Sequence, residues 1–388
     1  MKGYKINSRF SLIFPCYFAF FVSGAMVLTV GTLLPFIINE TRISYSAAGG
    51  LLSAFAVGNL MASFIFPFLA DNIGRKASIV TMSFLIPLSW ILIAMLPSLP
   101  IMYAAFILMG IGRGSISIIN NSIINDNFDG KPAALNLLHM TFAMGALRSP
   151  AITSIFVYVG WGWKAVAYTM VVATTLVFVS FSAMKIDYNW PKEKHKENGV
   201  KFYKMPVFYI MGLLLFLYLG LENCVNGWFV TYFQNMRIMD STYATNLVSL
   251  TWIMVMLGRL LTAKLSTYID KNWLIFAYCV ATAVFFILMI STNNAVVITV
   301  AIAGLGFFFA GIYPTSVSSA GRSLTGSTTG MSLFLAIAAI GRIVTPQIVG
   351  IAADARGLTA AIMILSFNVV GMLVLSLVNI KISKRKDG

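Results

Sequence analysis

Charged residues are scarce in this 388-residue sequence, which is 59% hydrophobic and only 10% charged. Soluble domains are usually about 45–50% apolar, so a chain of this composition has too few polar side chains to cover a soluble surface. The mean hydropathy of +0.87 indicates the same. The scarcity of charge therefore excludes a soluble globular protein and predicts an integral membrane protein.

Histidine and cysteine are also scarce, with two histidines and three cysteines in the chain. The cysteines, Cys16, Cys224 and Cys279, lie within long apolar runs and lack the spacing of metal ligands. We expect them to be small apolar packing residues. The sequence also lacks a nucleophile elbow and a phosphate-binding loop. It therefore predicts no metal, no cofactor and no enzymatic activity.

Long apolar runs make up most of the chain. A membrane-spanning helix needs roughly 20 mostly apolar residues, whereas a membrane β-barrel shows alternating segments of about ten residues. The runs favour helices and predict an all-α membrane protein with twelve transmembrane helices. They cover residues 11–38, 46–70, 77–97, 99–125, 134–159, 162–184, 206–236, 241–268, 273–291, 294–321, 326–353 and 357–380.

A net charge of +15 could indicate a nucleic-acid partner, so the positions of the charged residues have to be considered. With the N-terminus inside, most basic residues outside the runs fall in cytoplasmic segments, as the positive-inside rule requires. The first run exceeds the 7–15 residues of a cleaved signal sequence, so it is expected to span the membrane. We predict a multi-pass protein of the plasma (inner) membrane with both termini cytoplasmic and no nucleic-acid partner.

A polar stretch at residues 185–205 divides the chain into two six-helix bundles, residues 1–184 and 206–388, joined by a cytoplasmic linker. Segments of the two halves match at corresponding positions. They are GIGRGSISIINNS (110–122) with GLGFFFAGIYPTS (304–316), GALRSP (145–150) with GRIVTP (341–346), and Gly58-Asn59-Leu60 with Gly258-Arg259-Leu260. Repeated halves predict a solute site near the bilayer midplane and transport by alternating access.

The segment PFLADNIGRK (67–76) resembles the loop signature of the major facilitator superfamily, G-x-x-x-D-x-x-G-R-[RK], except that Pro67 replaces the first glycine. The resemblance implies that Asp71, Gly74 and Arg75 take part in gating at the cytoplasmic side. Many members also carry an arginine where this chain has Phe106, so the proton-coupling role proposed for that arginine is not transferred.

Three further stretches resemble the fucose–galactose–glucose:proton symporter branch of that superfamily. They are LNLLHMTFAMGALRSP (135–150), YLGLENCVNGWFVTYF (218–233) and GIYPTSVSSAG (311–321). The resemblance implies proton-driven uptake of sugars or similar solutes by a major facilitator fold.

Five charged residues lie near the middle of predicted spans, namely Arg113, Arg148, Arg259, Arg342 and Glu222. Such a residue costs about 2.5–3.5 kcal/mol at the bilayer centre on insertion scales, so it usually faces water or a partner and marks a transport pathway. In the fourth helix Arg113 begins a polar stripe on one helical face. The stripe continues through Ser117, Asn120 and Asn121, and we expect it to line the cavity.

The seventh helix carries a second stripe, formed by Tyr218, Glu222 and Asn226 at i, i+4 and i+8. Glu222 is the one carboxyl group at membrane depth, and low polarity favours the protonated form of a carboxyl. It is the candidate for proton coupling. The alternative is a structural ion pair between Glu222 and one of the arginines.

Arg148 and Arg342 lie in matching repeat segments and are candidates to bind an anionic solute from both halves. A neutral sugar is the alternative, in which case some arginines are structural, Arg259 first among them. Trp228 is a candidate to stack on a sugar ring, as are Tyr232 and Trp252, although aromatic residues in membrane helices also serve in packing.

The sequence thus favours a monomeric, proton-coupled symporter whose partners are a small polar solute, protons and the lipid bilayer. The candidate substrate-binding residues are Arg113, Asn120, Asn121, Arg148, Asn226, Trp228 and Arg342. A multidrug efflux transporter of the same fold is the alternative, although embedded arginines are poorly suited to cationic drugs.

Overall fold

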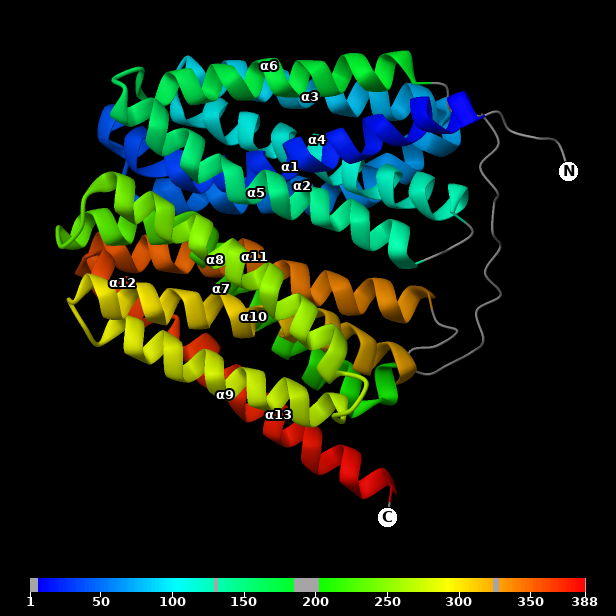
Figure 1. Cartoon of the computed structure of the whole chain (residues 1–388), viewed down its shortest axis with the longest axis vertical. Helices are drawn as coiled ribbons and strands as arrows, with labels where there is room; N and C mark the ends of the chain where they lie inside the picture. Colours follow the sequence, from blue (N-terminus) through cyan, green and yellow to red (C-terminus); the bar gives the residue numbers. More distant parts are fainter. Residues whose placement is uncertain (1–5, 129–131, 185–201, 324–327, 388) are drawn as a thin grey trace, which may run out of the picture. The chain divides into compact units, whose positions relative to one another are not determined.

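The computed structural model describes residues 6–128, 132–184, 202–323 and 328–387, and its elements are helices (Figure 1). The first six are α1 (Ile6–Thr41), α2 (Tyr45–Ile73), α3 (Arg75–Ala94), α4 (Leu99–Asn127), α5 (Pro132–Tyr158) and α6 (Gly162–Ala183). The remainder are the short 3-10 helix η1 (Phe202–Lys204), α7 (Pro206–Met236), α8 (Ser241–Leu265), α9 (Lys271–Ile290), α10 (Ala295–Ser323), α11 (Thr328–Arg356), α12 (Leu358–Met363) and α13 (Ser366–Asp387).

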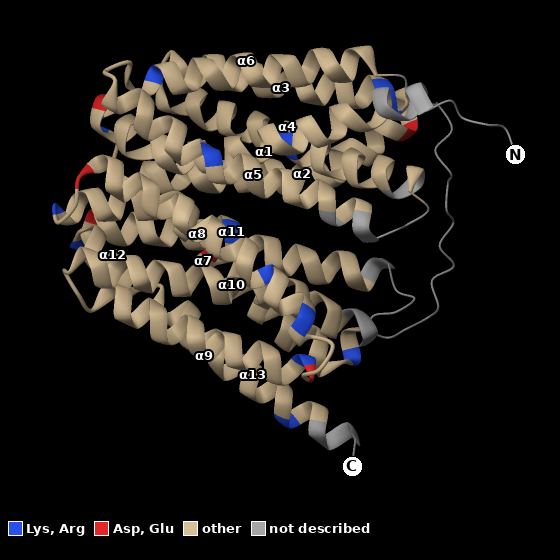
Figure 2. Cartoon of the chain, viewed as in Figure 1, with Lys and Arg blue, Asp and Glu red and all other residues tan. Residues whose placement is uncertain are grey.

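Within the described ranges, 12 helical segments are long and apolar enough to cross a membrane, which confirms the predicted number. The last of them, Leu358–Ser383, combines α12 with most of α13. Charged residues gather near the helix ends, with a few basic residues farther along the helices (Figure 2). The predicted linker lies mostly outside the described residues.

Contacts divide the chain into two units, Met1–Ile43 with Gly50–Lys192 and Ser44–Gly49 with Glu193–Gly388. In the first unit α1 packs on α5, and α3 packs on both α4 and α6. In the second unit α7 packs on α11, and α9 packs on both α10 and α13. The helix pairs correspond in chain order, as expected if the two halves are structural repeats.

The repeat is most visible where two helix backbones cross closely, at glycines that the sequence comparison matched. A Cβ atom on Gly145 of α5 would lie 1.8 Å from the carbonyl oxygen of Phe21 in α1. A Cβ atom on Gly341 of α11 would lie 1.9 Å from the carbonyl oxygen of Phe216 in α7. Small residues permit such close approach between membrane helices, so the two glycines serve equivalent crossings.

A second pair of matched glycines behaves in the same way. A Cβ atom on Gly58 of α2 would lie 2.0 Å from the carbonyl oxygen of Ile107 in α4. A Cβ atom on Gly258 of α8 would lie 2.0 Å from the carbonyl oxygen of Phe307 in α10. The weak sequence matches between the halves therefore arise at positions where both halves need a glycine for close helix packing.

Different polar contacts reinforce the equivalent crossings. Between α1 and α5, Thr29 and Ser149 share a buried hydroxyl hydrogen bond of 2.5 Å. Between α7 and α11, the Asn223 side-chain amide donates to the backbone carbonyl of Arg342 at 2.9 Å. The second contact fixes the height of α11 along α7 and thereby positions the side chain of Arg342.

The first turn of α2 is grouped with the second unit through contacts with α11. The backbone N–H groups of Tyr45 and Ser46 donate to the two carboxylate oxygens of Asp354, each at 2.8 Å. The first N–H groups of a helix have no partner within it and carry its positive dipole end, so a carboxylate stabilises them. Asp354 therefore caps α2 from the end of α11.

Candidate functional site

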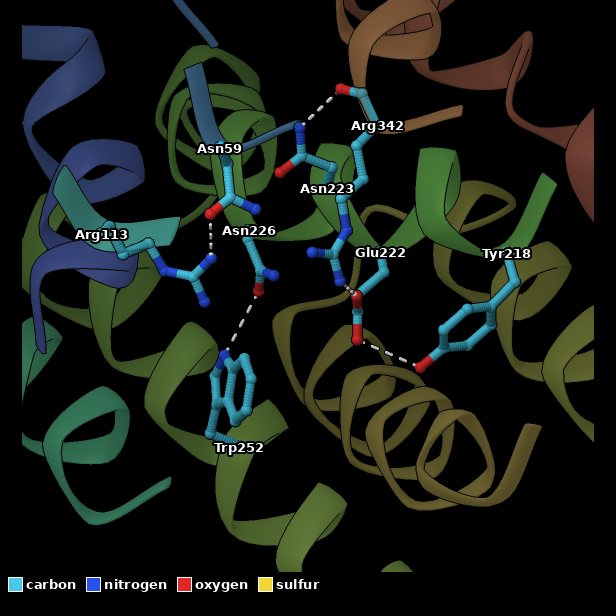
Figure 3. Close-up of polar contacts among 8 residues, drawn as sticks. All are labelled: Asn59, Arg113, Tyr218, Glu222, Asn223, Asn226, Trp252 and Arg342. Carbon is cyan, nitrogen blue, oxygen red and sulfur yellow. Dashed lines mark hydrogen bonds and ion pairs between the residues drawn. The ribbon is translucent and has the colours of Figure 1, made fainter. Parts of the chain in front are cut away.

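One cluster of polar residues inside the second unit surrounds Glu222 of α7 (Figure 3). One carboxylate oxygen, Oε2, accepts a hydrogen bond from Nη2 of Arg342 in α11 at 2.9 Å. The other, Oε1, accepts from the hydroxyl of Tyr218 at 3.1 Å. The side chains of Arg342 and Glu222 are 33% and 21% exposed, so the ion pair is held by the protein and still reachable from outside it.

Helical spacing and the close crossing bring these three side chains together. Tyr218 and Glu222 are four residues apart on α7 and therefore lie on the same face. Arg342 follows Gly341, a residue at which α11 crosses α7 closely. The close crossing at Gly341 thus places the guanidinium of Arg342 beside the carboxylate of Glu222. The sequence predicts Glu222 as an embedded acid, and the structure identifies Arg342 as its partner.

Further polar groups of the second unit surround this ion pair. The ring of Tyr313 in α10 lies 6.3 Å from that of Tyr218 and interacts electrostatically with Glu222 and Arg342. Arg259 of α8 interacts electrostatically with Tyr218. Arg259 is exposed and has neither a hydrogen bond nor an ion pair with another described residue. Arg342 is thus paired with the carboxylate, and Arg259 acts on the tyrosine that is bonded to it. The structural role expected for Arg259 stays a prediction.

Asn226 continues the predicted polar stripe of α7. Its side-chain oxygen accepts a hydrogen bond from the indole N–H of Trp252 in α8 at 3.2 Å (Figure 3). Asn226 is half-buried, and Trp252 is buried. The contact links α7 to α8 one turn beyond Glu222 and keeps a polar amide at this level of the second unit.

In the first unit Arg113 of α4 makes an embedded polar contact. Its Nη1 donates to the side-chain oxygen of Asn59 in α2 at 3.0 Å (Figure 3). Its guanidinium carbon also lies 5.6 Å from the ring centroid of Phe142 in α5, within the range of a cation–π attraction. Arg113 is therefore held between two neighbouring helices, with part of its side chain still accessible.

Arg148 is an exposed residue on α5. It forms no hydrogen bond or ion pair with any other residue in the described part of the chain. An unpaired arginine facing lipid at membrane depth is costly. The role of Arg148 in anion binding stays a prediction.

Three candidate substrate-binding residues are engaged with protein in this conformation. Asn120 is fully buried and donates to the carbonyl of Cys16 at 3.1 Å. Trp228 is fully buried, and its indole N–H donates to the carbonyl of Pro346 at 3.3 Å. Asn121 donates to the carbonyl of Ser117 in its own helix. Their contact with a solute stays a prediction. Arg113, Arg148, Asn226 and Arg342 are more accessible than Asn120 and Trp228, and Asn121 is half-buried like Asn226.

The predicted gating segment joins α2 to α3. Asp71 is exposed, whereas Arg75 is buried and its Nη2 donates to the hydroxyl of Ser122 in α4 at 3.2 Å. Gly74 has φ = 83°, a backbone conformation that L-residues with side chains rarely adopt. The glycine therefore makes the tight junction that turns Arg75 inward.

Lys76 adds a contact that the sequence did not predict. Its ammonium group donates to three backbone carbonyls at the end of α6, those of Phe181, Ser182 and Met184. The last carbonyls of a helix have no partner within it, and a cation there also matches the helix dipole. Arg75 and Lys76, the first residues of α3, thus connect α3 to α4 and α6.

Sequence reasoning missed several polar partners. The sequence indicates Asn59 only as part of a repeat, although an amide beside a matched glycine is itself a signal of polar contact. Asn223 follows Glu222 directly, and Tyr313 lies in the stretch that resembles sugar symporters. Each becomes recognisable only when the packing of α2 on α4, α7 on α11, or α10 on α7 is known.

Groups of three or more histidine, cysteine, aspartate or glutamate side chains that could hold a metal ion are absent from the described residues. The cysteines Cys16, Cys224 and Cys279 are buried and unpaired as disulfides. We assign no chemistry to them.

The chain belongs to the Major Facilitator Superfamily, whose family model matches residues 16–346. It is 21% identical to a "Protein TsgA homolog" from Erwinia tasmaniensis, with 92% of this chain and 91% of the relative covered. It is 23% identical to the glucose/mannose transporter GlcP of Bacillus subtilis, with 86% of each chain covered.

Solved structures share the fold. The nucleoside transporter NupG superposes with a TM-score of 0.79 at 12% identity, covering 98% of this chain and 100% of that chain. A D-xylose-proton symporter superposes with a TM-score of 0.75 at 12% identity, covering 95% and 97%. The predicted superfamily and twelve-helix major facilitator fold are therefore confirmed. The chain is a multi-pass membrane transporter of small solutes and not an enzyme.

Proposed function

We propose that this transporter is a proton-coupled symporter that takes up a small polar solute, either a neutral sugar or an organic or sugar-derived anion. One observation carries the proposal. A carboxylate within the membrane-spanning part of α7 is paired with Arg342 and bonded to Tyr218, yet remains partly exposed. A carboxyl in this position can gain and lose a proton and, in doing so, make and break an ion pair between two helices.

The relatives support the choice of solute class. One is named as a glucose/mannose transporter, and one neighbour of the same fold is named as a D-xylose-proton symporter. Both names describe transport of sugars, and the second includes a proton. The four arginines at membrane depth favour a polar or anionic solute over a cationic drug, which makes multidrug efflux the weaker alternative.

Roles for individual residues follow from their accessibility. We propose that Glu222 carries the proton and that Arg113, Arg148, Asn226 and Arg342 contact the solute. We also assign a solute contact to Asn121, which is half-buried. Asn120 and Trp228 would contribute only in a conformation that releases their present contacts. We further propose that Asp71, Gly74 and Arg75 control opening at the cytoplasmic side, and that the monomer works in the plasma membrane with both termini cytoplasmic.

The test is uptake by the purified protein in proteoliposomes with an inward proton gradient. Labelled neutral sugars and their acids, such as glucose with glucuronate and galactose with galacturonate, are supplied at equal concentration. We expect accumulation of members of one class above the level in protein-free liposomes, and loss of that accumulation when the proton gradient is collapsed. Accumulation that is unaffected by the gradient, or outward transport of a cationic dye in place of sugar uptake, would contradict the proposal.

A further inference from the structure

The charge around Glu222 does not balance within the second unit. Glu222 is paired with Arg342, while Arg259 acts on Tyr218 without an ion pair to any described residue. The other titratable groups facing the pair are the hydroxyls of Tyr218 and Tyr313, which are neutral at physiological pH. The cluster therefore carries one positive charge in excess.

Arg342 holds Glu222 by a single contact. Nη2 is its one guanidinium nitrogen with a hydrogen bond to a described residue, and that bond ends on one carboxylate oxygen. A guanidinium offers five N–H donors and binds a carboxylate most strongly through two parallel bonds. With a third of its side chain exposed, Arg342 can accept a second, better oriented carboxylate from outside the protein.

Protonation of Glu222 would leave Arg342 without its counter-ion. An arginine that loses its partner in a partly buried site is unfavourable unless another anion replaces it. Binding of a proton to Glu222 and binding of an anion to Arg342 should therefore assist each other.

We infer that the solute is a small monoanion, with a carboxylate as in a sugar acid, which replaces Glu222 on Arg342 when Glu222 takes up a proton. The inference rests on the proposed proton-coupled transport and narrows its solute class. On loading, the proton adds to Oε2 of Glu222 and the Nη2 hydrogen bond passes to the solute carboxylate. On release, the solute and the proton leave and the ion pair re-forms.

This exchange fixes the charge that crosses the membrane. The empty site holds one carboxylate and one guanidinium in its ion pair, and the loaded site holds a neutral acid with a guanidinium–carboxylate pair. One proton and one monoanion therefore travel together with no net charge. Their uptake should respond to the pH gradient and not to an electrical potential of the kind set by valinomycin and potassium.

The experiment uses small molecules to test directly whether Arg342 binds an anion. Glu222→Ala leaves both a space and an unpaired arginine, so sodium acetate should raise its thermal midpoint in detergent by about 2–4 °C relative to sodium chloride. Acetamide, which is similar in size and neutral, should not. Wild-type protein and the double variant Glu222→Ala/Arg342→Ala should respond equally to both compounds.

A second variant guards against failure of Glu222→Ala to fold. Glu222→Gln keeps the side-chain size and mimics the protonated acid, so glucuronate should stabilise it more than glucose does. If neither variant distinguishes the anion from its neutral analogue, the inference is overturned. That result would leave proton-coupled uptake of a neutral sugar intact, because the stability measurement involves no transport and no proton gradient.

Discussion

Replacing Glu222 by glutamine is expected to abolish proton-driven accumulation while leaving exchange of solute across the membrane. With one proton per solute, a gradient of one pH unit supports up to about tenfold accumulation, because one unit corresponds to about 1.4 kcal/mol. Glutamine cannot take up and release a proton, so the accumulation ratio should fall to about one. The measurement is uptake in proteoliposomes of whichever sugar or sugar acid the wild-type protein accumulates.

Exchange provides the internal control, because proteoliposomes loaded with unlabelled solute should still take up labelled solute through the variant. Glu40→Gln is the matched control for the chemical change. Glu40 lies at the end of α1, where it pairs with Lys164 at 2.7 Å with both side chains exposed, and such exposed pairs contribute little. Retained accumulation in Glu222→Gln would show that the proton is carried elsewhere.

Alanine at the glycine crossings is expected to have the second large effect, on folding. In Gly145→Ala and Gly341→Ala the new Cβ atom would lie within 2 Å of a backbone carbonyl oxygen, and a backbone cannot rotate away as a side chain can. Overpacking typically costs about 1–3 kcal/mol, and more where the backbone must shift. We expect lower yields of monodisperse protein and a lower thermal midpoint in detergent for both variants.

Gly212→Ala is the matched control, since it also lies within a helix but its nearest neighbours are side-chain atoms at 3.6 Å or more. There alanine should be neutral or slightly stabilising, because glycine within a helix costs about 0.5–1 kcal/mol relative to alanine. Equal behaviour of the three variants would contradict the assignment of Gly145 and Gly341 to close crossings.

The fold followed from the sequence because the membrane imposes a simple rule. Backbone polar groups in lipid must be satisfied within the span, so each long apolar run has to be a helix. The matched glycines Gly145 and Gly341 located equivalent helix crossings because a side chain at either position would collide with the neighbouring backbone, so glycine is required there. The break between α12 and α13 was not predicted, since the apolar run continues across it.

The site was predictable only in part. Glu222 and Arg342 stood out because charge at membrane depth is rare, but the sequence left open which arginine pairs with the acid. That choice depends on how α11 is placed along α7, which Gly341 and Asn223 determine through packing. The sequence likewise predicts solute contact for Trp228 and Asn120, because side-chain type alone does not reveal that both are buried in this conformation.

Proton movement during solute entry tests the role of Glu222 most directly. Proteoliposomes containing a trapped pH-sensitive dye start without a pH gradient, and the sugar or sugar acid that the wild-type protein accumulates is added outside. Wild-type protein should acidify the lumen as the solute enters. Glu222→Gln, whose exchange activity is measured separately in proteoliposomes loaded with unlabelled solute, should not acidify it. Solute entry through the wild-type protein with no acidification, or equal acidification by the variant, would contradict proton coupling at Glu222.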